Sequence, residues 1–259
     1  MLNVVPVRAF QDNYIWLIKD AVGRQAAIVD PGDARPVLQA LQTDNITPVA
    51  ILITHHHGDH VGGVESLLTR YPNLPVFGPA GERIPCITRR LAEGDVITVP
   101  GLEVEFRILD VPGHTRGHIA YFGEGALFCG DTVFSVGCGR LFEGTAEQMH
   151  ASLCKLASLP GDTLVYCAHE YTQSNIAFAK WVEPDNADLL QREQEAKDLR
   201  ARDLPTVPSR LEVERRTNPF LRFDAPTVIQ AASTFAGRSL RPGAEVFGTV
   251  RYWKDTEFD

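Results

Sequence analysis

Half of the histidines in this chain lie in one short segment. Of the eight histidines, four fall between His55 and His60, and Asp59 lies among them. Neutral imidazole and carboxylate groups are standard ligands for zinc and similar divalent ions. The segment follows the apolar run 49–53, which is typical of a buried strand. Ligands at the end of a strand indicate a catalytic metal site on a rigid scaffold.

The spacing within this segment divides the candidate ligands. His55 and His57 are two residues apart. Alternate residues of an extended segment point the same way, so both side chains can reach one ion. Asp59 and His60 come after a glycine at which a helix is expected to begin, and they can face a second ion. His56 has the opposite parity, so we expect it to be structural or exposed.

Three further candidates lie downstream, each directly after an apolar strand: His114, Asp131 and His169. Any one of them alone could be an ordinary hydrogen-bonded residue at the end of a strand. Because the pattern recurs three times, we interpret all three as ligands. Two ions then share the set, with His55, His57 and His114 on one, Asp59, His60 and His169 on the other, and Asp131 bridging both.

The elements that must position these residues alternate between strand and helix over the first 170 residues. Strands are expected at 14–18, 26–30, 76–77, 103–109 and 164–167, with a hairpin from 120 to 129, and helices at 34–41 and 61–69. A helix is also expected over 145–156, where Thr145 and Gln148 form a capping box.

After about residue 172 the pattern changes. Residues 174–202 are helical and highly charged, a polar stretch covers 204–216, and 227–235 is expected to be the final helix. We therefore predict a mixed α/β catalytic domain over 1–172 and a smaller helical, substrate-binding domain over 173–259.

The composition excludes several classes of function. A net charge of -8 argues against a nucleic-acid binder, which needs a basic face. No apolar run reaches the length of a membrane span, and the N-terminal residues lack the pattern of a secretory signal. The five cysteines are odd in number and form no CxxC pair, which favours a reducing compartment. We expect a cytoplasmic monomer that acts on a small molecule.

The histidine segment, together with Pro112-Gly113-His114-Thr115, Gly130-Asp131-Thr132 and the late His169, resembles the metallo-β-lactamase superfamily. The resemblance covers roughly residues 1–170. It implies an α/β fold, a four-layer αββα sandwich with the metals at one edge of the two sheets. It also implies that His118 is a supporting residue. Asp30 matches an aspartate that supports a ligand histidine, although a turn-capping role is an equal alternative.

A narrower resemblance extends over nearly the whole chain. The segments 137–145, 167–172, 218–222 and 250–255 are similar to those of the glyoxalase II family, the hydroxyacylglutathione hydrolases. This family implies a glutathione thioester substrate, typically S-D-lactoylglutathione, which is hydrolysed to glutathione and D-lactate in methylglyoxal detoxification. The family's substrate-binding positions correspond to Arg140, Phe142, Tyr171, Arg251 and Lys254.

Two of these positions depart from some relatives. Arg140 stands where others carry lysine, and arginine keeps the charge and can bind a carboxylate with two hydrogen bonds. Phe142 stands where others carry tyrosine, which leaves apolar contact only. For Arg251 and Lys254, the alternative is that they are solvated charges of the tail. An acidic protein that binds glutathione, with its two carboxylates, needs such a local basic pocket.

The resemblance implies a thiolester hydrolase that uses two divalent ions. Zinc is expected, and iron or manganese would suit the same ligands. A hydroxide shared by the two ions would attack the thioester carbonyl. The thiolate leaves without a strong general acid, because its parent thiol has a pKa of about 8.5. Asp59 and Asp131 then act as metal ligands in catalysis, and no serine or cysteine nucleophile is needed.

Three other functions fit parts of the pattern. An iron-dependent glutathione persulfide dioxygenase of the same fold would use one iron, and the helical C-terminal region argues against it. A lactamase or lactonase would share the metal ligands. A scaffold that binds metal without catalysis is disfavoured, since all seven ligand positions are intact.

Overall fold

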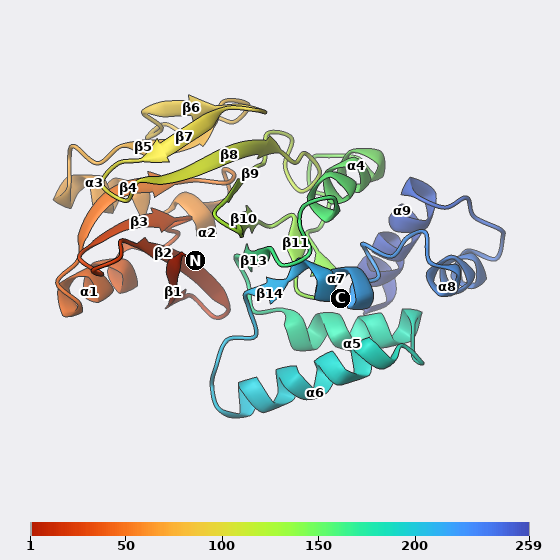
Figure 1. Cartoon of the computed structure of the whole chain (residues 1–259). Coiled ribbons are helices and arrows are strands. Elements are labelled where there is room, and N and C mark those ends of the chain that lie inside the picture. The colour runs from red at the N-terminus through yellow and green to blue at the C-terminus, as the bar shows by residue number, and fades with distance from the viewer. Residues whose placement is uncertain (1, 259) are drawn as a thin grey trace. The chain divides into compact units, whose positions relative to one another are not determined.

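The computed structural model describes residues 2–258, and packing divides the chain into two compact units. Unit one contains the chain up to Asp110 together with Thr115–Gly130. Unit two contains Val111–His114 and the chain from Asp131 onward. The domain boundary expected near residue 172 rests on the change from alternating strands and helices to charged helical segments, and it stays a prediction. Figure 1 colours the chain by residue number, so unit one occupies the red-to-green part of the bar.

The first sheet of unit one is mixed, with the strand order β1-β2-β3-β4-β5-β6. The pairs β1–β2 and β2–β3 are antiparallel, and the pairs from β3 to β6 are parallel. The strands are β1 (Asn3–Ala9), β2 (Asn13–Lys19), β3 (Gln25–Val29), β4 (Thr47–Leu52), β5 (Val76–Pro79) and β6 (Arg89–Leu91).

The middle strands of this sheet are buried along most of their length, as strands covered on both faces are. On one face, Ile28 and Ile51 share a core with Val37, Leu41 and Leu67 of the helices. Burial of such aliphatic side chains is the main force that holds the helices on the sheet. The helices of unit one are α1 (Ala34–Thr43), α2 (Gly58–Val61) and α3 (Val64–Arg70).

The second sheet of unit one is an antiparallel meander in the order β7-β8-β9-β10. Its strands are β7 (Val96–Val99), β8 (Val104–Asp110), β9 (Ile119–Gly123) and β10 (Ala126–Gly130). Phe106 packs edge-on against Tyr121 and Phe128. The Tyr121 hydroxyl donates to the backbone oxygen of Ile53 over 2.9 Å. This bond ties the second sheet to the residues that follow β4, where the histidine segment begins.

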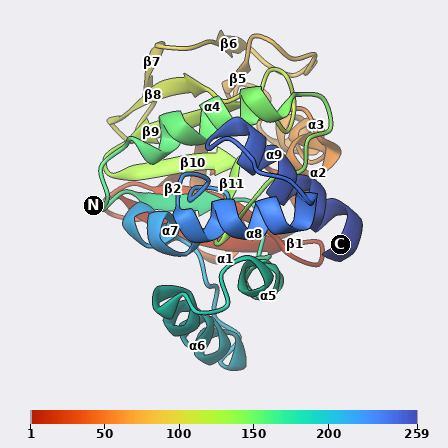
Figure 2. The ribbon, with the colours of Figure 1, turned by 90° about the vertical axis from the view of Figure 1, so that its right-hand side faces the viewer.

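Unit two is mostly helical. Its helices pack in pairs, α5 with α6, α8 with α9, and α4 with α9, and Figure 2 shows α5 beside α6. The short strands pair as β11 with β12 and β13 with β14. The elements are β11 (Val133–Phe134), β12 (Gly137–Cys138), α4 (Ala146–Ala157), β13 (Leu164–Cys167), α5 (Thr172–Val182), α6 (Ala187–Ala201), β14 (Ser209–Arg210), α7 (Leu211–Thr217), α8 (Pro226–Ala236), α9 (Ala244–Trp253) and the π-helical turn η1 (Lys254–Phe258).

Most expected elements are confirmed, and the structure contains further elements that were not expected. The capping box of α4 is present: Thr145 Oγ1 accepts from the Gln148 backbone amide, and Gln148 Oε1 accepts from the Thr145 backbone amide. The helix predicted at 227–235 is present as α8, but it is not the final one, because α9 and η1 follow it. The polar stretch 204–216 contains β14 and most of α7. Its apolar spacing is too sparse to reveal a helix whose core contact is carried mainly by Leu211.

Candidate metal centre and basic pocket

The histidine segment lies where the chain leaves β4 and enters α2. His57 has extended backbone angles at the N-cap of α2, and Asp59 and His60 lie in that short helix. The loop after β3 fits closely beneath it: a Cβ atom on Gly32 would lie 1.8 Å from the backbone oxygen of Asp59. Only glycine permits this approach. The turn after β3 and the turn after β4 therefore hold the segment in place together.

Within unit one, the ligand atoms are closely spaced. His55 Nε2 lies 3.1 Å from His57 Nδ1, and His60 Nε2 lies 3.5 Å from Asp59 Oδ2. Two ligands that each lie about 2.0–2.2 Å from an ion at a tetrahedral angle are about 3.3–3.6 Å apart. The Asp59–His60 separation lies within this range and the His55–His57 separation slightly below it, and the donor types suit a divalent ion. Asn13 Nδ2 donates to Asp59 Oδ2 over 3.0 Å and helps to orient that carboxylate.

Two predicted supporting residues of unit one lie behind the histidines. Asp30 Oδ2 accepts from His60 Nδ1 over 3.0 Å, which leaves His60 Nε2 for an ion. His118 stacks on His55 with ring centroids 4.5 Å apart, and its Nδ1 donates to the backbone oxygen of Ile119. Within its own turn, the backbone oxygen of Asp30, and not its carboxylate, accepts from the Gly32 amide over 2.9 Å. The contacts of the Asp30 carboxylate therefore favour the supporting role over the turn-capping role.

Unit two holds the other three candidates in one cluster. Asp131 Oδ2 lies 3.4 Å from Nε2 of both His114 and His169, the separation expected for ligands of shared ions. His114 Nδ1 donates to the backbone oxygen of Arg140 over 2.8 Å, so its Nε2 lone pair faces the cluster. Gly139 makes room, since a Cβ there would lie 2.0 Å from the Asp131 backbone oxygen.

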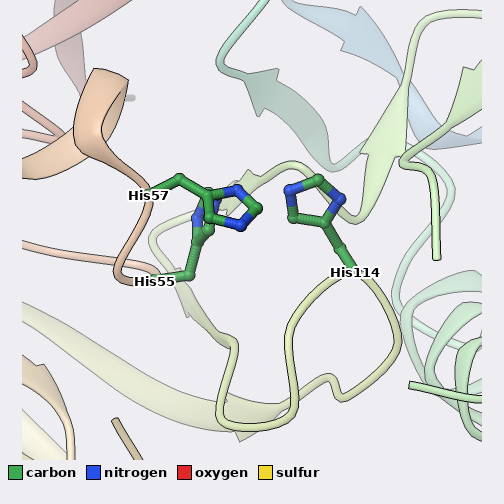
Figure 3. A group of neighbouring side chains, drawn as sticks. All are labelled: His55, His57 and His114. Carbon is green, nitrogen blue, oxygen red and sulfur yellow. The ribbon is translucent and has the colours of Figure 1, made fainter. Parts of the chain in front are cut away.

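The described residues contain three groups of side chains that could hold a metal ion. All seven predicted ligands occur in them, and His56 and His118 occur in none. Figure 3 draws one of these groups, with the rings of His55 and His57 next to each other.

A cavity of about 440 Å³ in unit two, here called the basic pocket, contains every predicted substrate-binding residue. Two of the candidate ligands also line it, so it reaches the metal cluster of this unit. Four of its residues were not predicted: Phe134, Cys138, Ser174 and Asn175. Its predicted lining comprises His114, Asp131, Arg140, Phe142, Tyr171, Arg251 and Lys254.

Arg251 and Lys254 are not solvated tail charges, because their exposed fractions are 2% and 7%. The Arg251 guanidinium donates to both oxygens of Asp255, over 2.7 and 3.2 Å, and to the backbone oxygen of Cys138. It lies over the ring of Phe220, 5.1 Å from its centroid. Such pairing makes burial of the charge tolerable.

Lys254 donates from Nζ to Asn175 Oδ1 over 2.9 Å. The Asn175 amide is itself fixed, since its Nδ2 donates to the backbone oxygen of Ser135. A carbonyl can only accept, so this contact turns Oδ1 toward the ammonium group. Asn175 lies on α5, and no local pattern in the sequence marks it, because its partners lie about 40 and 79 residues away.

The aromatic residues of the pocket pack on the candidate ligands. The Tyr171 ring stacks on His169 with centroids 4.7 Å apart and planes at 6°. Phe142 meets His114 edge-on at 5.2 Å, and 63% of its surface remains exposed. Arg140 is also about half exposed, with its Nε 3.8 Å from Asp255 Oδ1. These three residues can therefore still contact a ligand that enters the pocket.

The segment 218–222 supports the basic pocket from behind. Asn218 Nδ2 donates to the backbone oxygens of Phe134 and Gly137, which form the β11–β12 hairpin. Phe220 carries the Arg251 guanidinium on its ring. Arg222 makes a two-point ion pair with Glu183 at the end of α5. This motif therefore supports residues that line the cavity, and its own side chains are not among the lining residues.

The buried cysteines of unit two are poor nucleophiles. Burial raises the pKa of the Cys138 thiol, and the charge of Arg251 offsets only part of that effect. Burial raises the pKa of Cys167 to about 12. Since the thiolate is the reactive form, both side chains remain neutral thiols at neutral pH. This agrees with the expectation that no cysteine attacks the substrate.

In a comparison with known proteins, two consecutive parts of the chain match two protein families. Residues 9–169 match the metallo-beta-lactamase superfamily, and residues 170–257 match the C-terminal region of hydroxyacylglutathione hydrolases. Two relatives are named hydroxyacylglutathione hydrolase. The one from Nitrosomonas eutropha is 53% identical to this chain, and the one from Alkalilimnicola ehrlichii is 55% identical. Each alignment covers 98% of this chain and 99% of the relative.

Solved structures agree with the fold. ETHE1 from Myxococcus xanthus is 26% identical, with a TM-score of 0.58, over 84% of this chain and 98% of that one. TTHA1623, solved in a di-iron-bound form, is 28% identical, with a TM-score of 0.59, over 85% of this chain and 100% of that one. The predicted fold class, with its C-terminal helical region, is therefore confirmed.

Proposed function

The chain belongs to the hydroxyacylglutathione hydrolases of the metallo-β-lactamase superfamily, and we propose that it hydrolyses S-(2-hydroxyacyl)glutathione, typically S-D-lactoylglutathione, to glutathione and D-lactate. It is thus a thiolester hydrolase. The observation that carries this proposal is the basic pocket, which is lined both by the ligands His114 and Asp131 and by three cationic side chains. Relatives that share the name over the whole chain support it.

Two divalent ions are proposed as cofactors. The fold family implies divalent metal, and the donor atoms of each unit have suitable types and spacing. Zinc is the proposed metal, with iron as the alternative that the di-iron form of TTHA1623 supports, and manganese as a further one. The proposed ligands are His55, His57 and His114 for one ion, Asp59, His60 and His169 for the other, and Asp131 for both.

When bound, such ions lower the pKa of water and polarise a carbonyl oxygen. The protein's own residues then orient the ligand side chains. Asp30 and Arg140, through its backbone oxygen, hold His60 and His114 with Nε2 directed inward. Asp59 is fixed by Asn13 and acts as a ligand in this proposal, not as a free base. The thiolate product needs no acid from the protein, given its pKa of about 8.5.

The glutathione moiety is proposed to occupy the basic pocket. Its two carboxylates match the cationic groups of Arg140, Arg251 and Lys254 in a chain whose net charge is otherwise -8. Tyr171 and Phe142 offer apolar surface next to the ligands His169 and His114. We propose that the thioester lies between these rings and that the carboxylates reach the cations. The persulfide dioxygenase alternative lacks this support from the C-terminal region.

A substrate comparison tests the proposal. The value of kcat/KM should be measured for S-D-lactoylglutathione and for the D-lactoyl thioester of N-acetylcysteamine, which has no carboxylate. Loss of charge-assisted hydrogen bonds of about 1.5–3 kcal/mol each should reduce kcat/KM by about tenfold or more. Equal values for the two thioesters would reject glutathione recognition. Rapid oxygen consumption with glutathione persulfide would favour the dioxygenase.

The cellular setting is also a proposal. We propose a cytoplasmic monomer that binds neither nucleic acid nor membranes. Support comes from the acidic net charge and from cysteines that are all free thiols. None of the helices in residues 2–258 is long and apolar enough to cross a bilayer. Light scattering of the purified protein would measure the oligomeric state directly.

A further inference from the structure

Thr54 precedes the first histidine of the metal segment and is completely buried. Its hydroxyl lies 2.7 Å from Asp30 Oδ2 and 3.1 Å from His55 Nδ1. Its backbone nitrogen donates to the other oxygen of Asp30 over 2.8 Å. Gly130 keeps the space open, since a Cβ there would lie 2.3 Å from Thr54 Oγ1. The hydroxyl is therefore held between a carboxylate and an imidazole.

The direction of these hydrogen bonds follows from the donor inventory. The Asp30 carboxylate only accepts, so the single hydroxyl proton of Thr54 points to Asp30. The hydroxyl oxygen can then only accept from His55, which requires a proton on His55 Nδ1. His55 Nε2 keeps its lone pair, and this atom faces His57 at 3.1 Å. The contact thus selects the tautomer that a metal ligand needs.

Asp30 performs the same task for His60 without an intermediary, because it accepts from His60 Nδ1 over 3.0 Å. One buried carboxylate therefore controls two histidines, one directly and one through a hydroxyl. The two histidines are assigned to different ions in the proposed centre. Their rings lie 4.0 Å apart, so a turn of either ring would disturb the other.

We propose that Thr54 is a positioning residue that passes the hydrogen bond of Asp30 to His55, so that the chain prepares its ligands for both ions before metal binds. This inference rests on the proposed metal centre and concerns no residue that touches substrate. The hydroxyl is the essential feature, and the shape of the side chain is secondary. Serine at position 54 should therefore preserve metal affinity. Valine, which has the shape of threonine but no hydroxyl, should lower it.

The first test is the metal affinity of Thr54→Val and Thr54→Ser, measured by competition with a chelator and by elemental analysis of the purified protein. Loss of a hydrogen bond to a ligand histidine should weaken zinc binding about 10–100-fold in Thr54→Val. Thr54→Ser should bind zinc like the wild type. Thr163→Val is the matched control, because Thr163 is also buried and its hydroxyl has no hydrogen-bond partner among residues 2–258.

The second test needs no variant. Nitrogen-15 NMR of the histidine side chains in metal-free wild-type protein should show His55 protonated on Nδ1. A proton on Nε2 would overturn the inference even if Thr54→Val failed to fold. Equal loss of affinity in Thr54→Ser and Thr54→Val would overturn it as well. Neither readout uses thioester hydrolysis, so failure of the proposed function would be detected separately.

Discussion

At the scale of single residues, Asp131 is the most critical, because it is the one proposed ligand of both ions. Its Oδ2 is 3.4 Å from Nε2 of both His114 and His169, and among residues 131–258 it is the one carboxylate that belongs to a candidate metal group. We predict that Asp131→Ala releases metal and abolishes thioester hydrolysis, as measured by elemental analysis and turnover. Exposed Asp162→Ala is the control and should change neither. Full metal content with retained turnover in Asp131→Ala would contradict its role as a shared ligand.

Lys254 should affect binding of substrate more than its conversion. Its ammonium group lines the basic pocket, where Asn175 Oδ1 accepts from it, and Lys254 is not one of the candidate metal ligands. We predict that Lys254→Met raises KM for S-D-lactoylglutathione by about tenfold and leaves kcat nearly unchanged. Lys197→Met, on the exposed side of α6, should leave both constants unchanged. A fall in kcat with an unaltered KM would assign Lys254 another role.

At the scale of elements, two turns hold the metal segment. Gly32, in the turn after β3, has no room for a Cβ beside Asp59, whereas a Cβ on Gly58, at the start of α2, would meet open space. We predict that Gly32→Ala displaces the segment and lowers metal content, and that Gly58→Ala retains it. Elemental analysis of both purified variants distinguishes them. Equal metal content in the two variants would show that the turn after β3 does not position the ligands.

The end of α5 provides a test with pH. Burial alone would raise the pKa of Glu183, but hydrogen bonds from Arg222 and Thr227 outweigh burial and lower it. The unfolded chain then binds the proton more readily, so this pair stabilises the fold above about pH 4.3, and the contribution is lost as the pH falls through the lower pKa of the folded state.

We predict that Glu183→Gln lowers the free energy of unfolding at pH 7 by about 1.5–3 kcal/mol, and by less at pH 3.5. Urea unfolding at the two pH values measures this. Glu193→Gln removes partly exposed pairs with Lys180 and Lys197 and should cost at most about 1 kcal/mol. A cost for Glu183→Gln that did not change with pH would mean that packing, and not charge, links α5 to the segment 218–222.

At the scale of the whole molecule, an acidic chain binds an acidic ligand through a local concentration of positive charge. Attraction of this kind is screened by salt, since the Debye length falls from about 30 Å at 0.01 M to about 3 Å at 1 M. We predict that KM for S-D-lactoylglutathione rises with ionic strength while kcat changes little. The neutral N-acetylcysteamine thioester should show no such dependence. An equal response of both substrates would contradict electrostatic recognition.

The sequence predicts the metal ligands better than it predicts their surroundings. His55 to His60 form a continuous segment, and His114, Asp131 and His169 each follow a strand, so the pattern is local and visible. Arg251 and Lys254 are found only through the family resemblance. Asn175 acts through partners 40 and 79 residues away, and nothing local distinguishes it from other polar residues. Thr54 adjoins the histidine segment and Asn218 lies in a segment that resembles the family, but neither position reveals the contact that its side chain makes. The helices α7 and α9 were missed because tertiary packing, more than periodicity, determines them.

The most direct test combines metal analysis with turnover of S-D-lactoylglutathione by the same preparation. We predict two divalent ions per chain and a loss of thioester absorbance that stops when a chelator removes the metal and resumes when zinc or iron is restored. Two bound ions without hydrolysis of this thioester would contradict the account, since the metal centre would then be intact and the assigned reaction absent.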